Sequence, residues 1–387
     1  MSTILDPILN AISKHPTRSK LGLALMVYMA IVRSLRYRRI NSLLKKYQDP
    51  TLPFRDLDAA REISAAVIKY EHPYLSSTSL EFALFKTYAI PTISKILAST
   101  REFTDNALKR SDDTAFILLE MAERTARKQY REKESGGIVD EKEDENDKLR
   151  EEIAVQKLNF IHGHYNIKQE DYLYTLALFV LEPPKWINRF EWRKMTELEK
   201  NALLAIWIYN GERMYIENIP RTIKELEEWT EEYESKHMVY AKSNGIVAES
   251  TTGLLLSRAP RFMHSFVRNV ISSLLTDRIR TAFGIPAPPV GLTPFVNSFL
   301  MIRGLFVRYF MLPRRYPMIR SALRGDPKND NQYIPLWNKF GVTYPNGYKV
   351  QDLGPEKFIG KCPFTLKGID NQSSSSSKDI MASKIGL

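Results

Sequence analysis

Apolar residues recur at helical spacing in one segment of this chain after another. In "NIKQEDYLYTLALFVLEPP" they form a stripe along one side of a helix, and "TELEKNALLAIWIYNGERM" repeats the design. The stripe of the first segment holds Leu173, Leu176, Ala177, Val180 and Leu181. Further helical stretches are expected at about 220–240, 262–283 and 294–311. Runs with period two are few and short, and no internal repeat is evident. The sequence therefore predicts an all-α fold with one large multi-helix domain.

Capping residues and prolines predict where several helices begin and end. Asn166 with Gln169, and Thr196 with Glu199, have the spacing of capping boxes. The two aspartates of "DDTAFILLEM" are of the capping type as well. Pro91 is expected to break or kink a helix, and the pair "PP" at 183–184 is expected to end one.

Composition narrows the class of protein. The chain has 387 residues, of which 43% are hydrophobic and 11% aromatic, so it is not mainly disordered. Its net charge of +11 is scattered along the sequence and fits an anionic lipid surface. No zinc-finger spacing, RNA-binding signature or basic heptad segment is present, so no nucleic-acid partner is expected. The single cysteine, Cys362, excludes an internal disulfide and a multi-cysteine metal site.

The N-terminal region carries a segment typical of a membrane anchor. "LGLALMVYMAIV" (21–32) holds no charge and is followed by "RSLRYRR". The run is shorter than the roughly 20 residues of a full span, so a span requires flanking side chains to extend toward the headgroups. A buried or interfacial helix is the alternative. Cations are more numerous after the run than before it, which predicts a single-pass anchor with the rest of the protein on the cytosolic side.

These patterns divide the chain into three regions. Residues 1–48 are predicted to be an anchor region with a hydrophobic helix, and 49–350 a helical catalytic domain. Within this domain, the charge-dense segment 131–152 is expected to be a solvated surface loop. The remainder, 351–387, is expected to be a tail that is disordered from about the serine-rich stretch at 371.

The sequence lacks the common enzyme signatures, and histidine in a helical protein remains as the candidate for chemistry. There is no G-x-S-x-G elbow, phosphate-binding loop, dinucleotide-binding turn, H-E-x-x-H motif or paired E-x-x-H motif. His162 and His164 lie two residues apart in "KLNFIHGHYNI", at the end of a helix expected from about Lys148. Two positions correspond to roughly 200° of rotation, so both cannot bind one metal on a regular helix. The apolar surface near Val155 favours His162 as the inward residue, and a hydrogen-bonded core histidine is the alternative.

Several segments together resemble the fungal ER-bound oxygenases of the MpaB type, and more distantly the catalytic domain of rubber oxygenase (latex-clearing protein). They are "LEFALFKTYAIPTISKIL", "KRSDDTAFILLEM", "KLNFIHGHYNIKQEDYLYTLALFVLEPPKWINRFEWRKMTELEKNA" and "YESKHMVYAKSNGIVAESTTGLLL". The likeness runs from about residue 25 to 350, and the block from "FIHGHYNI" to "LFVLEP" is its most specific part.

The resemblance implies a globin-like or rubber-oxygenase-like helical core that binds haem b, with its iron held by one axial histidine. Position by position, it assigns the ligand to His162 in the Ile161–His162 pair, and places Arg110 and Thr114 beside the haem. It further implies cleavage of a carbon–carbon double bond in a prenyl or isoprenoid chain by O₂, in fungal secondary metabolism. The expected partners are a lipophilic prenylated small molecule, O₂ and the membrane of the endoplasmic reticulum.

The sequence departs from the family pattern at two positions. Bacterial rubber oxygenases carry a lysine just before the threonine, where this chain has Asp113. Their glutamate base has no clear counterpart here beyond Glu102. The alternative is therefore a non-catalytic, membrane-associated helical protein that keeps the fold without haem. Among the other histidines, His237 is interpreted as a packed or capping residue, and His264, His72 and His15 have no further support.

Overall fold

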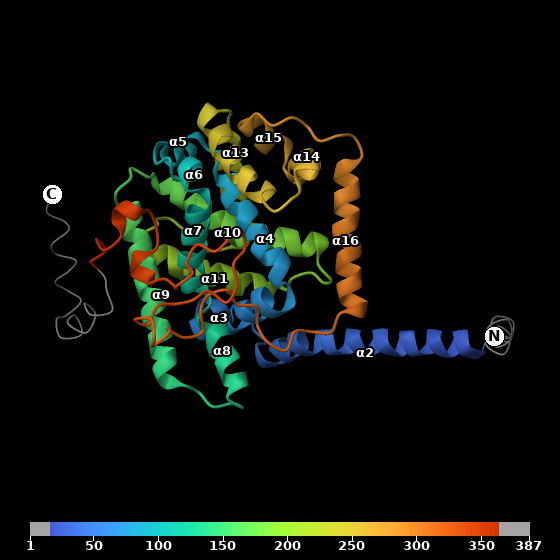
Figure 1. The fold of residues 1–387 in the computed structure, drawn as a ribbon. Helices are drawn as coiled ribbons and strands as arrows, with labels where there is room; N and C mark the ends of the chain where they lie inside the picture. The colour runs from blue at the N-terminus through green and yellow to red at the C-terminus, as the bar shows by residue number, and fades with distance from the viewer. Residues whose placement is uncertain (1–15, 364–387) are drawn as a thin grey trace.

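The computed structural model describes residues 16–363 (Figure 1). Over these residues the fold is helical, with no strand and two isolated β-bridges, so the all-α prediction is confirmed. The α-helices are α2 (Pro16–Lys46), α3 (Leu57–Ala65), α4 (Pro73–Thr87), α5 (Pro91–Ser99), α6 (Glu102–Asp105), α7 (Ala107–Ala122), α8 (Arg124–Glu134), α9 (Glu141–His162), α10 (Gln169–Phe190), α11 (Glu197–Arg213), α12 (Ile223–His237), α13 (Lys242–Leu256), α14 (His264–Leu274), α15 (Asp277–Phe283) and α16 (Leu292–Phe310). The shorter helical turns are η1 (Leu52–Phe54), η2 (Ala66–Glu71), η3 (Arg261–Met263), η4 (Val350–Asp352) and η5 (Glu356–Phe358).

Helix α10 lies in the middle of the fold, between α4, α11, α12 and α16. The predicted stripe is buried against α11 and α12, while Tyr174, Leu178 and Phe179 are buried on the opposite side. The helix continues through Pro183 and Pro184 to its end, so the predicted stop at these prolines is wrong. Packing on all sides stabilises the helical path despite the backbone hydrogen bonds that the prolines remove.

One of the two predicted capping boxes is present. In α11 the Glu199 amide donates to Thr196 Oγ1 at 3.3 Å, and the Thr196 amide donates to Glu199 Oε2 at 2.8 Å. The predicted box of Asn166 and Gln169 is wrong, because α10 begins after Lys168 without a side-chain cap. The Gln169 amide group instead forms hydrogen bonds with the backbone that follows α11.

The predicted break at Pro91 is present, but the predicted caps at Asp112 and Asp113 are not. α4 ends at Thr87 and α5 begins at Pro91, which confirms the predicted break. α7 begins at Ala107, so Asp112 and Asp113 lie inside the helix and are buried, and their assignment as caps is wrong. Both carboxylates are held by residues of the C-terminal segment instead.

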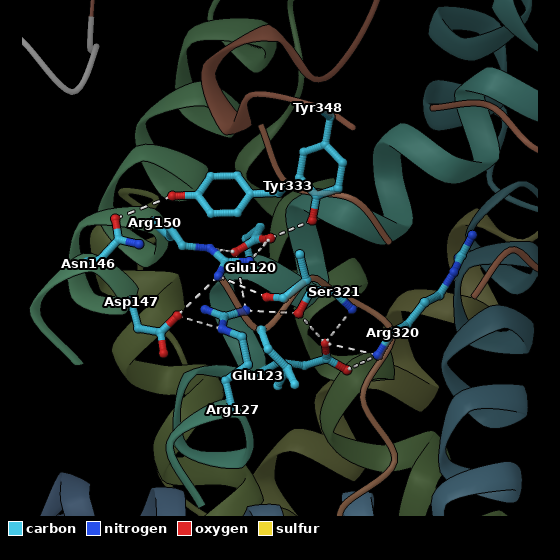
Figure 2. Close-up of polar contacts among 12 residues, drawn as sticks. Glu120, Glu123, Arg127, Asn146, Asp147, Arg150, Arg320, Ser321, Tyr333 and Tyr348 are labelled. Atoms are coloured by element: carbon cyan, nitrogen blue, oxygen red, sulfur yellow. Dashed lines mark hydrogen bonds and ion pairs between the residues drawn. The ribbon is translucent and has the colours of Figure 1, made fainter. Parts of the chain in front are cut away.

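The charge-dense segment 131–152 is helical over most of its length, and its assignment as a solvated loop is wrong. α8 and α9 cover it except for residues 135–140. Asp147 and Arg150 are fully buried, and Arg150 donates to the two oxygens of Glu120 at 2.7 and 2.8 Å (Figure 2). These charges occur in the interior because each has a hydrogen-bonded partner there.

Residues 311–363 form a mostly irregular strap, here called the C-terminal strap, that packs on α7 and α9. Arg127 donates to Ser321 Oγ at 3.0 Å (Figure 2). Arg150 donates to the carbonyl of Ala322, the next residue of the strap, at 3.0 Å. Further along the strap, Leu353 is buried in the same apolar cluster as residues of α7 and α9. The tail predicted to be disordered from about 371 lies outside the described residues.

The segment predicted to be a membrane anchor lies within α2. Residues 16–363 include no helix that is both long and apolar enough to cross a membrane, so the predicted single-pass span is not supported. The second half of α2 packs on the body of the protein, where Val32, Arg36, Ile40 and Leu43 are buried.

Candidate functional site

A largely apolar cavity lies between α4, α5, α7, α9, α10, α11 and α13. Its volume is about 340 Å³, within the range of roughly 300–1,000 Å³ for small-molecule and cofactor sites. Apolar and aromatic side chains make up most of the wall, among them Phe85, Tyr88, Ile117, Leu158, Phe179 and Trp207. The C-terminal strap adds Arg320, Lys339, Phe340, Gly354 and Pro355 to it.

His162 lies on the wall of this cavity, at the last residue of α9. Its ring is 5.4 Å from the ring of Tyr172, and its Nδ1 atom is buried without a hydrogen-bond partner. Burial, together with repulsion from the Arg110 guanidinium, lowers the pKa of His162 from 6.5 to about 4. The imidazole is therefore neutral at physiological pH, which is the form that binds metals.

His164 lies on the other side of the chain and does not line the cavity. Its Nδ1 atom is 2.7 Å from the carbonyl oxygen of Phe160, and its ring packs on Phe358 at 4.6 Å. The two histidines thus point to different surroundings, as the rotation of the helix predicts.

Arg110 and Thr114 line the cavity from one face of α7. Thr114 Oγ1 donates to the carbonyl oxygen of Arg110 at 2.9 Å and accepts a hydrogen bond from the Arg110 guanidinium. The guanidinium also lies over the ring of Phe103 at 5.3 Å. The structure therefore brings Arg110, Thr114 and His162 to one cavity from two helices.

The two residues at which the sequence departs from the family pattern also line the cavity. Asp113 is buried, with its carboxylate 2.8 Å from Lys109 Nζ and hydrogen-bonded by the Tyr344 hydroxyl. Lys109 in turn donates to the carbonyl of Gly354 at 2.7 Å. Asp113 is thus occupied in holding the C-terminal strap. Glu102, at the start of α6, is half-buried on the same cavity wall.

Two further polar residues of the cavity wall were not singled out from the sequence. Asp171 is buried, accepts hydrogen bonds from Thr92 at 2.8 Å and from the Tyr233 hydroxyl, and leaves Oδ2 without a partner. Burial and the hydrogen bond to Asp171 raise the pKa of Tyr233 above its ordinary value. The hydroxyl of Tyr165 is also buried without a partner. An aspartate in the first turn of a helix is ordinary, so the sequence carries no signal that distinguishes Asp171.

The remaining described histidines lie away from the cavity. His237 is half-buried at the end of α12, which agrees with its interpretation as a packed residue. The ring of His264 forms a hydrogen bond with the backbone carbonyl of Ala259. His72 is fully buried, with its Nδ1 atom 3.4 Å from Glu191 Oε2. His15 lies outside the described residues.

The residues of the cavity fit a haem better than a bare metal ion. Within the part of the chain that the structure describes, no three or more His, Cys, Asp or Glu side chains come together as a metal site. A haem needs only one protein ligand, for which the neutral imidazole of His162 is suited. The Arg110 guanidinium is suited to bind a propionate carboxylate, and the unpartnered polar atoms of His162, Tyr165 and Asp171 are available to a bound group.

Comparison with known proteins identifies the family. The sequence profile described as "ER-bound oxygenase mpaB/B'/Rubber oxygenase, catalytic domain" matches residues 87–303. The chain belongs to this family. Members of this mpaB/rubber oxygenase family include "ER-bound oxygenase mpaB'" of Penicillium brevicompactum, which is 29% identical to this chain over 420 residues, covering 93% of this chain and 95% of the relative.

Two other relatives carry the name "ER-bound oxygenase mpaB". The one from Penicillium brevicompactum is 28% identical over 372 residues, covering 86% of this chain and 83% of the relative. The one from Penicillium roqueforti (strain FM164) is 31% identical over 279 residues, covering 67% of this chain and 87% of the relative. The resemblance seen in the sequence is therefore confirmed, and the mpaB/rubber oxygenase family makes the chain an oxygenase. The matched range contains Arg110, Thr114 and His162 and ends before the C-terminal strap.

Proposed function

We propose that this chain is a haem-dependent oxygenase that uses O₂ to cleave a carbon–carbon double bond in the prenyl chain of a lipophilic small molecule. One observation carries the proposal: a neutral histidine, His162, lies on the wall of an apolar cavity that Arg110 and Thr114 also line. Membership of the oxygenase family supports the reaction class. The reaction consumes one O₂ per double bond and gives two carbonyl groups, so it needs no external reductant.

When bound, the haem would supply an iron centre that activates O₂. His162 would hold this group from α9, and Arg110 would bind its carboxylate edge. The Thr114 hydroxyl, fixed by its hydrogen bond to the Arg110 carbonyl, would orient a polar ligand on the same side. The apolar wall would position the alkene and exclude water, since an alkene offers no group for hydrogen bonding.

The side chains of this cavity also limit which carboxylate could hold a proton during the reaction. Asp113 is held by Lys109 and Tyr344. Asp171 has one oxygen bonded by Thr92 and Tyr233 and the other unpartnered. Asp171 is therefore a stronger candidate for proton transfer than Asp113.

We further propose that the protein works at the membrane of the endoplasmic reticulum, with its catalytic domain on the cytosolic side. The relatives are named ER-bound. A prenylated substrate partitions into the bilayer, so a membrane location would raise its concentration near the enzyme.

The proposed ligand is tested by absorption spectroscopy of the protein produced with haem supplied. The wild type is expected to show a Soret band that is largely lost in His162→Ala, because the imidazole is the proposed iron ligand. His164→Ala is the matched control and is expected to keep the band, because His164 does not line the cavity.

A wild type without a Soret band would contradict the haem proposal and favour a non-catalytic protein that keeps the fold without the cofactor. Loss of the band in His164→Ala with retention in His162→Ala would show that the ligand is wrongly assigned. Circular dichroism of both variants separates loss of haem from loss of folding.

A further inference from the structure

The outer half of α2 presents apolar side chains on all its sides. Leu21, Leu23, Met26 and Val27 are 73%, 59%, 58% and 50% exposed, although they point in different directions around the helix. Figure 1 shows this part of α2 extending away from the body of the protein, past α16. A helix that is apolar all round is stable only in apolar surroundings.

A second helix, α16, exposes an apolar stripe on one face. Phe295, Phe299, Ile302, Phe306 and Phe310 follow helical spacing and are 61%, 63%, 64%, 53% and 38% exposed. The opposite face packs on the protein, where Val296, Gly304 and Val307 are buried. α16 therefore exposes its apolar stripe on the surface of the protein, where a helix of a water-soluble domain would expose polar side chains.

The two helices meet at the end of α16. The Tyr28 hydroxyl donates to the carbonyl oxygen of Phe310 at 2.8 Å, and Arg36 Nε donates to that of Met311 at 2.6 Å. Exposed apolar residues continue across the junction, with Ile31 51% and Leu312 55% exposed. The apolar parts of α2 and α16 thus adjoin each other.

The two segments that carry this surface have ionisable charges of one sign. Residues 16–46 and 278–325 contain no Asp or Glu, although the whole chain has 45 of these residues. Arg33, Arg38 and Arg315 are exposed beside the apolar residues. Cations that flank an apolar surface match the phosphate groups of anionic lipids.

We propose that the outer half of α2 and the exposed stripe of α16 form one membrane-binding surface for an anionic lipid bilayer. α2 inserts its apolar outer half among the lipid chains, while α16 lies at the interface. This inference rests on the proposed membrane location and deepens it, because it adds α16 and the class of lipid.

The placement also bears on how a lipophilic substrate reaches the cavity. Leu300 of α16 and Phe82 of α4 both pack against the cluster of Leu75, Trp186 and Phe190, and Phe82 lines the cavity. An apolar layer thus connects the membrane-binding surface with the cavity wall.

The test is flotation of the full-length protein with vesicles of phosphatidylcholine, with and without phosphatidylserine. The α16 variant carries Phe299→Ser, Ile302→Ser and Phe306→Ser, and the α2 variant carries Leu21→Ser, Leu23→Ser and Met26→Ser. The control carries Ile138→Ser, Val139→Ser and Ile359→Ser, whose side chains are 70%, 48% and 46% exposed elsewhere. We expect the wild type and the control to bind vesicles that contain phosphatidylserine, and both test variants to bind about tenfold more weakly or worse.

Each of the following results would contradict one named part of the proposal. Equal binding of the α16 variant and the wild type, with loss in the α2 variant, would overturn the role of α16 and leave the membrane location standing. Equal binding to both vesicle types would overturn the preference for anionic lipid. No binding by the wild type would contradict the membrane location itself. If the α16 variant bound vesicles normally but turned a dimer into a monomer in gel filtration, a second copy would cover the stripe. Soret spectra of all variants report separately on the proposed haem site.

Discussion

Two features of the surroundings of His162 disfavour its charged form. It is half-buried on an apolar wall, and the Arg110 guanidinium lies near enough to repel its charged form. Both effects keep the imidazole neutral well below ordinary pH. A neutral ring at the wall of a cavity is preorganised for a ligand that needs a nitrogen lone pair.

This neutrality predicts how the stability of the haem-free protein depends on pH. The folded pKa of His162 is about 4, against 6.5 for an ordinary histidine, so between these values the unfolded chain binds a proton that the folded chain does not. The unfolding free energy of the wild type should therefore fall as the pH is lowered through this window. Relative to His162→Gln, the wild type should lose up to about 2 kcal/mol between pH 6.5 and about pH 5.

Urea unfolding at the two pH values, with the protein free of haem, measures this difference. His164→Gln is the control and should follow the wild type. If the wild type and His162→Gln lost the same free energy, the titration of His162 would not contribute to stability in this range.

Helical spacing and apolar neighbours favoured His162 as the inward histidine, but the resemblance to the oxygenase family was needed to bring Arg110, Thr114 and His162 into one hypothesis. Each of them lies on a helix whose inward face follows from its apolar neighbours. Asp171 could not be recognised in this way, because its significance depends on Tyr233, 62 residues later in the chain. A contact of that kind is set by the packing of α10 against α12.

At the scale of elements, periodicity predicted the helices more reliably than local signals predicted their ends. The prolines of α10 and the aspartates of α7 have strong local preferences that tertiary packing overrides. The buried charges of α9 were misassigned for the same reason, since their partners come from α7, α8 and the C-terminal strap. Sequence shows that a residue is charged, but burial depends on a partner that only the fold supplies.

The close contact of α16 with α10 at Gly304 predicts that adding one methyl group there lowers stability. A Cβ atom added at Gly304 would lie 2.5 Å from the carbonyl oxygen of Phe190, so the helices would have to separate. We expect Gly304→Ala to lower the unfolding free energy by about 1–3 kcal/mol. Gly253→Ala in α13 is the control, because a Cβ atom there meets nothing within 4 Å and should leave stability unchanged or raise it by up to about 1 kcal/mol. Equal effects of the two changes in urea unfolding would contradict the close contact.

For the whole molecule, the C-terminal strap forms part of the wall of a cavity that helices otherwise surround. It contributes Arg320, Lys339 and Phe340 to the wall, and it crosses α7 and α9 at the buried ion-pair cluster (Figure 2). Burial alone would raise the pKa of Glu120, but Arg150 and Arg127 outweigh it and hold the pKa below its ordinary value. The ionised carboxylate is thus favoured in the folded state. This contribution to stability is present above the ordinary pKa of Glu120 and is lost as the pH falls through its lowered value.

Removal of the Arg150 guanidinium should therefore loosen the strap as well as the helices. In Arg150→Met the Glu120 carboxylate loses its two short hydrogen bonds and the Ala322 carbonyl loses its donor. We expect a loss of about 3–5 kcal/mol in unfolding free energy, because one buried charge is left without its main partner. The double variant Glu120→Gln with Arg150→Met should recover part of this loss, since the uncompensated charge is removed.

Limited proteolysis followed by mass spectrometry measures how firmly the C-terminal strap is held on the helices. Under conditions where the variant remains folded, cleavage within residues 311–363 should be faster in Arg150→Met than in Lys148→Met. Lys148 lies on the same helix, but its ion pair with Glu145 at 2.9 Å is exposed, so its loss should change stability by less than about 1 kcal/mol. Equal cleavage rates in the two variants would show that Arg150 is not needed to hold the strap, and that its other contacts suffice. Faster cleavage together with a weaker Soret band would show that the cluster also keeps the cavity closed around its ligand.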